Sequence, residues 1–216
     1  GGDLDIGIRN YLQFDGFAYK FVPIRSVTRT ADVEQVDAMK MFDKVMKVYE
    51  FDNLADTTIN IDYQNLATFN GVMNIRNIFV KTALALFEDG EKEKCVQVLD
   101  RMQEVMVPEN FPLNSSLLYS VNEYVVLQAI EIYIKCGERE KGLKLANDFA
   151  KETLEGVELY AKPYKTGILS ESELETSYSL YAYLVEILSA NGEVEEAKKL
   201  ELNFNELITD IANSYK

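Results

Sequence analysis

Carboxylates are the side chains of this sequence best placed to do chemistry, and they gather in four clusters. The clusters are Glu91 with Glu93, Glu138 with Glu140, Glu171 with Glu173 and Glu175, and Glu193 with Glu195 and Glu196. Paired carboxylates can act as acid and base on a sugar, or can bind calcium. None of the clusters has the loop spacing of a calcium site. Because each cluster opens a predicted helix, we interpret these charges as partners of the helix dipole on a solvated face.

Other reactive arrangements are missing from the sequence. It contains no histidine, which excludes Ser-His-Asp and Cys-His nucleophile systems and imidazole-ligated metal sites. It also lacks a phosphate-binding loop and the GxGxxG, GxSxG and HExxH motifs. We therefore predict no catalytic residue, no metal ion and no cofactor for this chain.

Cys95 and Cys136 lie far apart in the sequence and form no CxxC pair. Both fall in apolar helical settings, so we interpret them as buried free thiols. A disulfide bridge or a reactive site is the alternative, because sequence alone cannot give the geometry that a bridge requires.

Arg76 falls on the apolar face of a predicted helix. The face carries one stripe at helical spacing, formed by Phe69, Val72, Met73, Arg76, Phe79 and Ala83. A buried guanidinium needs a partner, since an uncompensated charge is costly. Asp62, just upstream, is the candidate. Arg76 would bind an anion in a groove or, as we favour, form an Arg76–Asp62 pair that pins the loop of residues 53–65 onto the helices.

Tyrosines are frequent, and several gather late in the chain: Tyr160, Tyr164, Tyr178, Tyr181 and Tyr183. A tyrosine offers a large ring and a polar tip, so a sugar or a peptide could stack on such a patch. Tyr178 and Tyr181 also follow the core spacing of a helix. We therefore interpret most of the cluster as packing and retain Tyr178 and Tyr181 as candidate binding residues.

Charge and hydropathy restrict the partners. The 216 residues include 22 Lys and Arg against 36 Asp and Glu, a net charge of −14, which argues against nucleic acid and anionic membrane surfaces. The apolar share of 47% is typical of a globular chain. The longest apolar stretch, residues 124–134, is too short to span a membrane. The first residues do not resemble a signal peptide.

The N-terminal part, residues 8–24, is aromatic and partly alternating. Asp15 and Gly16 separate two apolar runs and predict a β-hairpin, because both residue types accept a positive φ. Pro23 restricts the second strand to an edge or to its end. We predict that a segment of residues 1–30 holds this hairpin and packs on a helical domain of residues 31–216.

The helical domain begins with a short helix, capped by Asp37 and ending at Asp52 and Asn53. From about residue 68 onward we predict three pairs of helices. Each pair is joined by a turn in which glutamate follows glycine: DGEKEK at Gly90, CGEREK at Gly137 and NGEVEE at Gly192. The glycine ends the first helix in the left-handed conformation, and so short a turn makes the helices antiparallel.

A small residue (Cys95, Gly142 or Ala197) stands five positions after each of these glycines. We therefore predict a mainly α fold of tandem antiparallel helix hairpins, a tetratricopeptide-like α-α superhelix, with a small N-terminal β-hairpin. The glycines are 47 and 55 residues apart, which is longer than the tetratricopeptide period. We place the excess in linkers at residues 107–113 and 155–169. An ordinary bundle of six or seven helices is the alternative.

Three runs carry a family resemblance: YLQFDGFAYKFVPI at residues 11–24, VDAMKMFDKVMKVYEFDNL at residues 36–54, and residues 59–100, which end in FEDGEKEKCVQVLD. They resemble the C-terminal soluble region of a family of bacterial multi-pass membrane proteins of unknown function. The N-terminal part of that family is similar to protein O-mannosyltransferases. The resemblance implies an accessory domain of a larger membrane protein, on the periplasmic side of the inner membrane. The glycosyl-transfer carboxylates would lie in the membrane part.

We expect a non-catalytic interaction domain that binds a protein or a glycan-bearing partner on the concave face of the helix stack. One alternative is a structural element that packs against the membrane domain of its parent protein. The other is a sugar-acting enzyme domain with Asp and Glu pairs across a tyrosine-lined groove.

Overall fold

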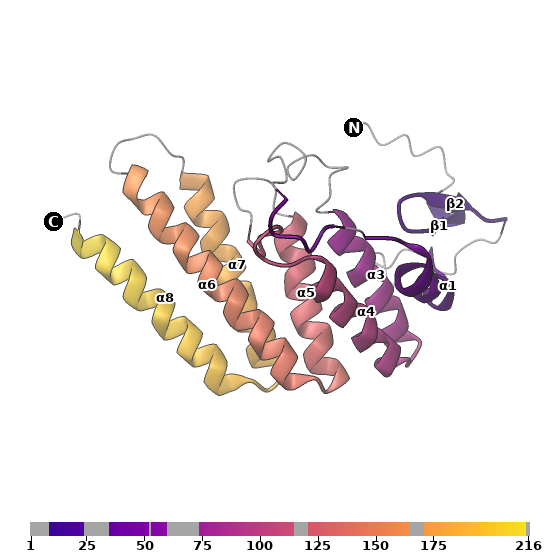
Figure 1. Cartoon of the computed structure of the whole chain (residues 1–216). Coiled ribbons are helices and arrows are strands. Elements are labelled where there is room, and N and C mark those ends of the chain that lie inside the picture. Colours follow the sequence, from indigo (N-terminus) through magenta and orange to yellow (C-terminus); the bar gives the residue numbers. More distant parts are fainter. Residues whose placement is uncertain are drawn as a thin grey trace.

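The computed structural model of the chain describes residues 9–23, 35–51, 53–59, 74–114, 121–164 and 171–214. A small sheet and a short helix form the N-terminal part, and pairs of long helices follow one another in chain order (Figure 1). The predicted fold class, mainly α with tandem helix hairpins and a small N-terminal β-hairpin, is confirmed. The predicted domain boundary near residue 30 lies outside the described residues.

The sheet contains the predicted hairpin and one additional strand. A 3-10 turn, η1 (Arg9–Tyr11), leads into β1 (Leu12–Phe14), which pairs antiparallel with β2 (Tyr19–Phe21). β3 (Gln35–Val36) pairs parallel with the other side of β1 and was not predicted. β2 is therefore an edge strand that ends before Pro23, as predicted.

The turn between β1 and β2 includes two residues beyond Asp15 and Gly16. It spans residues 15–18, and the Asp15 amide donates a hydrogen bond to the Ala18 carbonyl at 2.9 Å. Gly16 has a positive φ of 84°, whereas Asp15 does not, so the predicted hairpin forms but only one of its two turn residues adopts the expected conformation. A Cβ at Gly16 would also collide with the hydroxyl of Tyr49. The missing side chain of Gly16 thus lets the backbone approach this tyrosine.

The hairpin is fastened to the helix that follows it. Helix α1 (Ala38–Asp43) begins at Asp37, whose side chain accepts a hydrogen bond from the Lys40 amide at 3.1 Å, as the predicted cap requires. It continues as the π-helical turn η2 (Lys44–Val48), which ends before the predicted Asp52 and Asn53. The Asp15 carboxylate pairs with Lys44 at 2.7 Å and with Lys40 at 3.2 Å.

Three helix hairpins follow. They are α3 (Asn74–Glu88) with α4 (Lys92–Val105), α5 (Val121–Cys136) with α6 (Arg139–Tyr164), and α7 (Glu171–Ala190) with α8 (Val194–Ser214). Gly90, Gly137 and Gly192 end the first helix of each pair with φ values of 81°, 93° and 88°, as predicted. α5 packs against both α3 and α4, and α7 packs against both α5 and α6. The hairpins therefore stack in tandem, with their short turns along one edge, the lower one in Figure 1.

The small residues after the turns allow the helices to approach closely. Cys95, Gly142 and Ala197 are all buried. A Cβ at Gly142 would lie 2.7 Å from Cγ1 of Ile134 and 3.3 Å from the carbonyl oxygen of Ile130. α5 and α6 thus touch at a point where a larger side chain does not fit.

α6 is longer than predicted. We expected a linker over residues 155–169, but the helix continues through Gly156 to Tyr164. Val157 is buried in the core, and its burial outweighs the helix-propensity cost of glycine, which is about 1 kcal/mol. Within the described ranges, no helix combines the length and apolarity that crossing a bilayer requires.

Candidate functional site

Arg76 lies in the first turn of α3, and only 1% of its surface is exposed. Its Nη2 donates a hydrogen bond to the Phe111 carbonyl at 2.8 Å, and its Nη1 donates one to the Pro112 carbonyl at 3.0 Å. Both carbonyls belong to the segment that connects α4 to α5. Arg76 therefore fixes the linker between the first and second hairpins.

Glu152 of α6 holds the same linker from the other side. Its Oε2 accepts hydrogen bonds from the backbone amides of Leu113 at 2.7 Å and Asn114 at 3.0 Å. Burial raises the pKa of the Glu152 carboxyl, while these hydrogen bonds and the charge of Arg76 act to lower it. We call Arg76, Glu152 and residues 111–114 the linker clamp.

Charge is balanced inside the linker clamp. Burial lowers the pKa of Arg76 to about 10, while the charges of Glu152 and Glu123 act to raise it. The guanidinium therefore stays protonated at neutral pH. Because it is buried and committed to backbone carbonyls, it is not open to an anion from solvent. Asp62 lies outside the described residues, so the predicted Arg76–Asp62 pair stays a prediction.

Tyr178 and Tyr181 lie on α7 in different surroundings. Tyr181 is buried, its hydroxyl donates a hydrogen bond to the Leu200 carbonyl at 2.9 Å, and burial raises its pKa to about 12. Tyr178 is 60% exposed, and its ring packs edge-on against Phe204 with centroids 5.4 Å apart. Of these two candidates, Tyr181 joins α7 to α8, and Tyr178 is the one open to a ligand.

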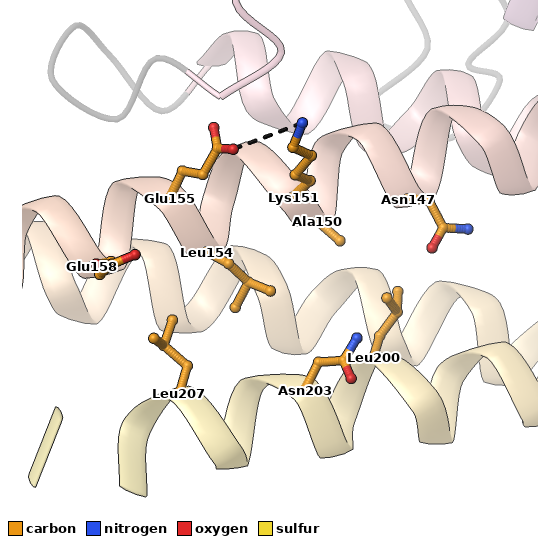
Figure 2. Close-up of a pocket in the computed structure, with 9 residues that line it drawn as sticks. All are labelled: Asn147, Ala150, Lys151, Leu154, Glu155, Glu158, Leu200, Asn203 and Leu207. Carbon is orange, nitrogen blue, oxygen red and sulfur yellow. Dashed lines mark ion pairs between the residues drawn. The ribbon is translucent and has the colours of Figure 1, made fainter. Parts of the chain in front are cut away.

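A groove of about 350 Å³ runs between α6 and α8 (Figure 2). We call it the α6–α8 groove. Its lining residues are Asn147, Ala150, Lys151, Leu154, Glu155 and Glu158 of α6 with Leu200, Asn203 and Leu207 of α8. In Figure 2, Leu154 of α6 faces Leu200 and Leu207 of α8, whereas Lys151 and Glu155 point away from α8. The leucines therefore form an apolar centre beside the amides of Asn147 and Asn203, and the charged side chains stand at the outer edge of α6.

The α6–α8 groove was not predicted from the sequence. Leu154, Leu200 and Leu207 stand on apolar stripes of their helices, and a stripe normally predicts full burial. In the structure, Leu154 and Leu207 are only partly buried, because no described helix covers the space between α6 and α8. A pattern of residue types cannot show which part of a stripe stays uncovered.

Exposed aromatic side chains form two further groups. Tyr124 of α5 and Tyr183 of α7 are 47% and 39% exposed, and their ring centroids lie 6.1 Å apart. At the hairpin, Phe17, Tyr19 and Phe21 are 63%, 49% and 58% exposed. Each group offers ring surface to a partner.

One of the predicted solvated carboxylates has a different role. The Glu193 side chain is only 10% exposed, and Nε and Nη2 of Arg139 lie 2.7–2.9 Å from its carboxylate oxygens. This ion pair joins the turn at Gly137 to the turn at Gly192. The repeated turns could have predicted this contact, because residues that follow equivalent glycines become neighbours along one edge.

No three His, Cys, Asp or Glu side chains within the described residues gather as metal ligands do.

Comparison of the chain with family models, with curated proteins and with solved structures gives no match.

Proposed function

We propose that the chain is a non-catalytic protein-interaction domain whose α6–α8 groove binds an amphipathic segment of a partner. One observation carries the proposal: leucines of two different hairpins face each other across an open groove. Grooves of this kind bind helical or extended segments by burying their apolar side chains. The partner segment would place apolar residues against Leu154, Leu200 and Leu207.

Charge favours a basic partner. The chain has a net charge of −14, and Glu155 and Glu158 stand on the rim of the groove. An acidic field attracts a basic segment before contact and accelerates its association. We therefore propose that lysines or arginines flank the apolar residues of the partner segment.

The placement of the acids favours binding over sugar hydrolysis. Glu155 and Glu158 both belong to α6, and the α8 wall of the groove consists of Leu200, Asn203 and Leu207. Glycoside hydrolysis needs carboxylates on both sides of the bond, roughly 5–10 Å apart. The residues that line this groove supply carboxylates from α6 alone.

A labelled peptide tests the proposal. A helical peptide with leucines on one face and lysines on the other, and a scrambled peptide of the same composition, are titrated with the chain by fluorescence anisotropy. We expect the ordered peptide to bind more tightly, and the Glu155→Lys/Glu158→Lys variant to weaken its binding about tenfold. The Glu201→Lys/Glu206→Lys variant makes the same charge change at exposed positions of α8 outside the groove. Equal binding of both peptides, or equal weakening by both variants, would contradict the proposal.

The exposed tyrosine pair supports a glycan-bearing partner as a second candidate. Tyr124 and Tyr183 belong to α5 and α7, the first helices of their hairpins, and under this second proposal these helices form the concave binding face. Sugars stack on such rings. A mannose disaccharide should shift the ring resonances of both tyrosines in NMR spectra, and Tyr124→Ala should abolish the shift at Tyr183. Unchanged ring resonances at millimolar sugar would exclude this candidate.

The hairpin supports a structural role as the other candidate. On the resemblance, we propose that the chain is part of a glycosyltransferase-like membrane protein and lies on its periplasmic side. Phe17, Tyr19 and Phe21 would then pack against the membrane domain. In the full-length protein, crosslinking from position 17 should reach that domain, and an alkaline phosphatase fusion after residue 216 should be active. An inactive fusion, or an upstream coding sequence without membrane-length apolar spans, would refute this assignment.

A further inference from the structure

Cys95 and Cys136 face each other across the boundary between the first and second hairpins. Cys95 lies in the first turn of α4, and Cys136 is the last residue of α5. Their Sγ atoms are 3.6 Å apart, and both cysteines are free thiols. Cys95 is fully buried, whereas Cys136 is partly exposed. Two thiols 41 positions apart in the sequence thus lie in contact, one of them within reach of solvent.

The two sulfur atoms are in van der Waals contact, within reach of bond formation. The bonded distance is about 2.05 Å, so the sulfur atoms need to approach by about 1.5 Å, which side-chain rotation and a small helix shift supply. The helix ends are already held together, because Lys92 of α4 donates a hydrogen bond to the Lys135 carbonyl of α5 at 3.5 Å. No large rearrangement of the hairpins is required.

We propose that Cys95 and Cys136 form a reversible disulfide that links the first hairpin to the second when a peroxide reaches the stack. Cys136 reacts first, because it is the more exposed thiol. Its thiolate attacks one oxygen of the peroxide, the O–O bond breaks, and a sulfenic acid forms with release of hydroxide, which takes up the thiol proton as water. The Cys95 sulfur then attacks the Cys136 sulfur, the S–O bond breaks, and a second water leaves.

The overall reaction converts two thiols and one hydrogen peroxide into one disulfide and two waters. A dithiol reductant reverses it by thiol–disulfide exchange. Burial raises the pKa of both thiols, while the Cys95 thiol and the charge of Lys92 act to lower that of Cys136. The thiolate is therefore scarce at neutral pH, and the bridge forms slowly compared with reactive sensor cysteines.

The bridge would fix the angle between the first two hairpins. It would also close a long loop, because α4, the linker and α5 lie between its ends. A cross-link of this kind removes conformations from the unfolded chain and stabilises the fold. The oxidised chain is therefore expected to melt at a Tm roughly 5–10 °C higher than the reduced chain.

The test is oxidation of the purified chain with hydrogen peroxide, followed by intact mass and peptide mapping without reductant. We expect a monomer that has lost two hydrogens, a peptide linking residues 95 and 136, and a higher Tm that dithiothreitol reverses. Cys95→Ala should stop at a sulfenic acid on Cys136, which dimedone traps, and Cys136→Ala should not react. The second variant retains the buried Cys95, so it serves even if Cys95→Ala fails to fold.

Other products would overturn the proposal. Two thiols that remain open to alkylation after denaturation, a dimer linked through Cys136, or a wild-type chain that accumulates the dimedone adduct would each show that the pair does not close.

Discussion

The linker clamp shows how single residues can order a segment that has no secondary structure. The planar guanidinium of Arg76 donates to two successive carbonyls, and Glu152 accepts from the two amides that follow. Four consecutive backbone polar groups are thereby satisfied by two side chains, which a buried segment requires. Each side chain also neutralises part of the charge of the other.

Arg76→Met tests the clamp. The substitution removes the hydrogen bonds to the two carbonyls and takes the cation away from the buried Glu123 and the partly buried Glu152, so we expect a loss of about 3–5 kcal/mol in the free energy of unfolding. Urea unfolding followed by circular dichroism measures the loss. Arg101→Ala is the control, since Arg101 forms an exposed pair with Glu104 and should cost less than about 0.5 kcal/mol. A loss below about 1 kcal/mol for Arg76→Met would refute the clamp.

Tyr181→Phe tests the contact between α7 and α8. The variant keeps the buried ring but removes the hydrogen bond to the Leu200 carbonyl, so we expect a loss of about 1 kcal/mol. Tyr178→Phe alters an exposed tyrosine of the same helix and should change stability by less than about 0.3 kcal/mol. Chemical unfolding of both variants measures the difference. Equal losses for the two variants would show that the hydrogen bond of the Tyr181 hydroxyl does not contribute to the free energy of unfolding.

The sequence predicted that Arg76 lies on an apolar helix face, but it could not predict which groups accept hydrogen bonds from the guanidinium. The stripe of apolar residues marked the position, because a charged side chain at helical spacing among apolar ones stands out. The acceptors are carbonyls 35 and 36 residues away, and any residue type carries a carbonyl. The role of Glu152 could not be predicted either, since a glutamate on a helix normally indicates a solvated face.

At the scale of the elements, the turns were predictable and the lengths were not. Gly90, Gly137 and Gly192 are local signals, because a left-handed residue ends a helix whatever surrounds it. The extension of α6 depends on the burial of Val157, and β3 depends on pairing with a strand more than twenty residues earlier. Contacts between segments distant in the sequence determine the length of α6 and the formation of β3, so no local sequence pattern predicts either feature.

The Arg139–Glu193 pair provides a test of how neighbouring hairpins are joined. Glu193 is nearly buried and held by several contacts, so a double-mutant cycle with Arg139→Ala and Glu193→Gln should give a coupling of about 0.5–1 kcal/mol. The pair of Lys198 with Glu195 is exposed and lies within one helix, and it should couple by less than about 0.3 kcal/mol. Thermal or urea unfolding measures both cycles. The coupling should also weaken at high salt, and a salt-independent value would contradict an ion pair.

At the scale of the whole molecule, the buried titratable groups predict lability in alkali. Burial raises the pKa values of Cys95 and Cys136 above 9.0, and those of Tyr133 and Tyr181 above 10.0. As the pH rises past 9 and then 10, the unfolded chain loses protons that the folded chain keeps. Each such group costs about 1.4 kcal/mol of stability per pH unit once it titrates fully in the unfolded chain.

Arg76 acts in the opposite direction at higher pH. Its pKa is about 10 in the folded chain and 12.5 in the unfolded chain, so above pH 10 its contribution to stability rises. Above pH 10 two tyrosines join the two thiols and a single arginine opposes them, so we expect stability to fall more steeply above pH 10 than below it. The decline between pH 9 and 10, measured by urea unfolding with reductant present, comes mainly from the thiols. Cys95→Ala/Cys136→Ala should flatten that decline. Stability that stays constant or increases from pH 8 to 10 would contradict the buried thiols.

The linker between α4 and α5, held by both of the first two hairpins, also affects the order in which the hairpins unfold. Arrays of helical repeats tend to unfold one repeat at a time, because each repeat contacts only its neighbours. A clamp that draws on α3 and α6 ties the first two hairpins into one cooperative unit. The third hairpin has no share in this clamp and is held to the second by packing and the Arg139–Glu193 pair, so we expect it to fray first. A ligand in the α6–α8 groove would bridge these two units. Binding of this ligand should slow amide hydrogen exchange first in α8. We also expect it to merge two thermal unfolding transitions, one for each unit, into a single transition.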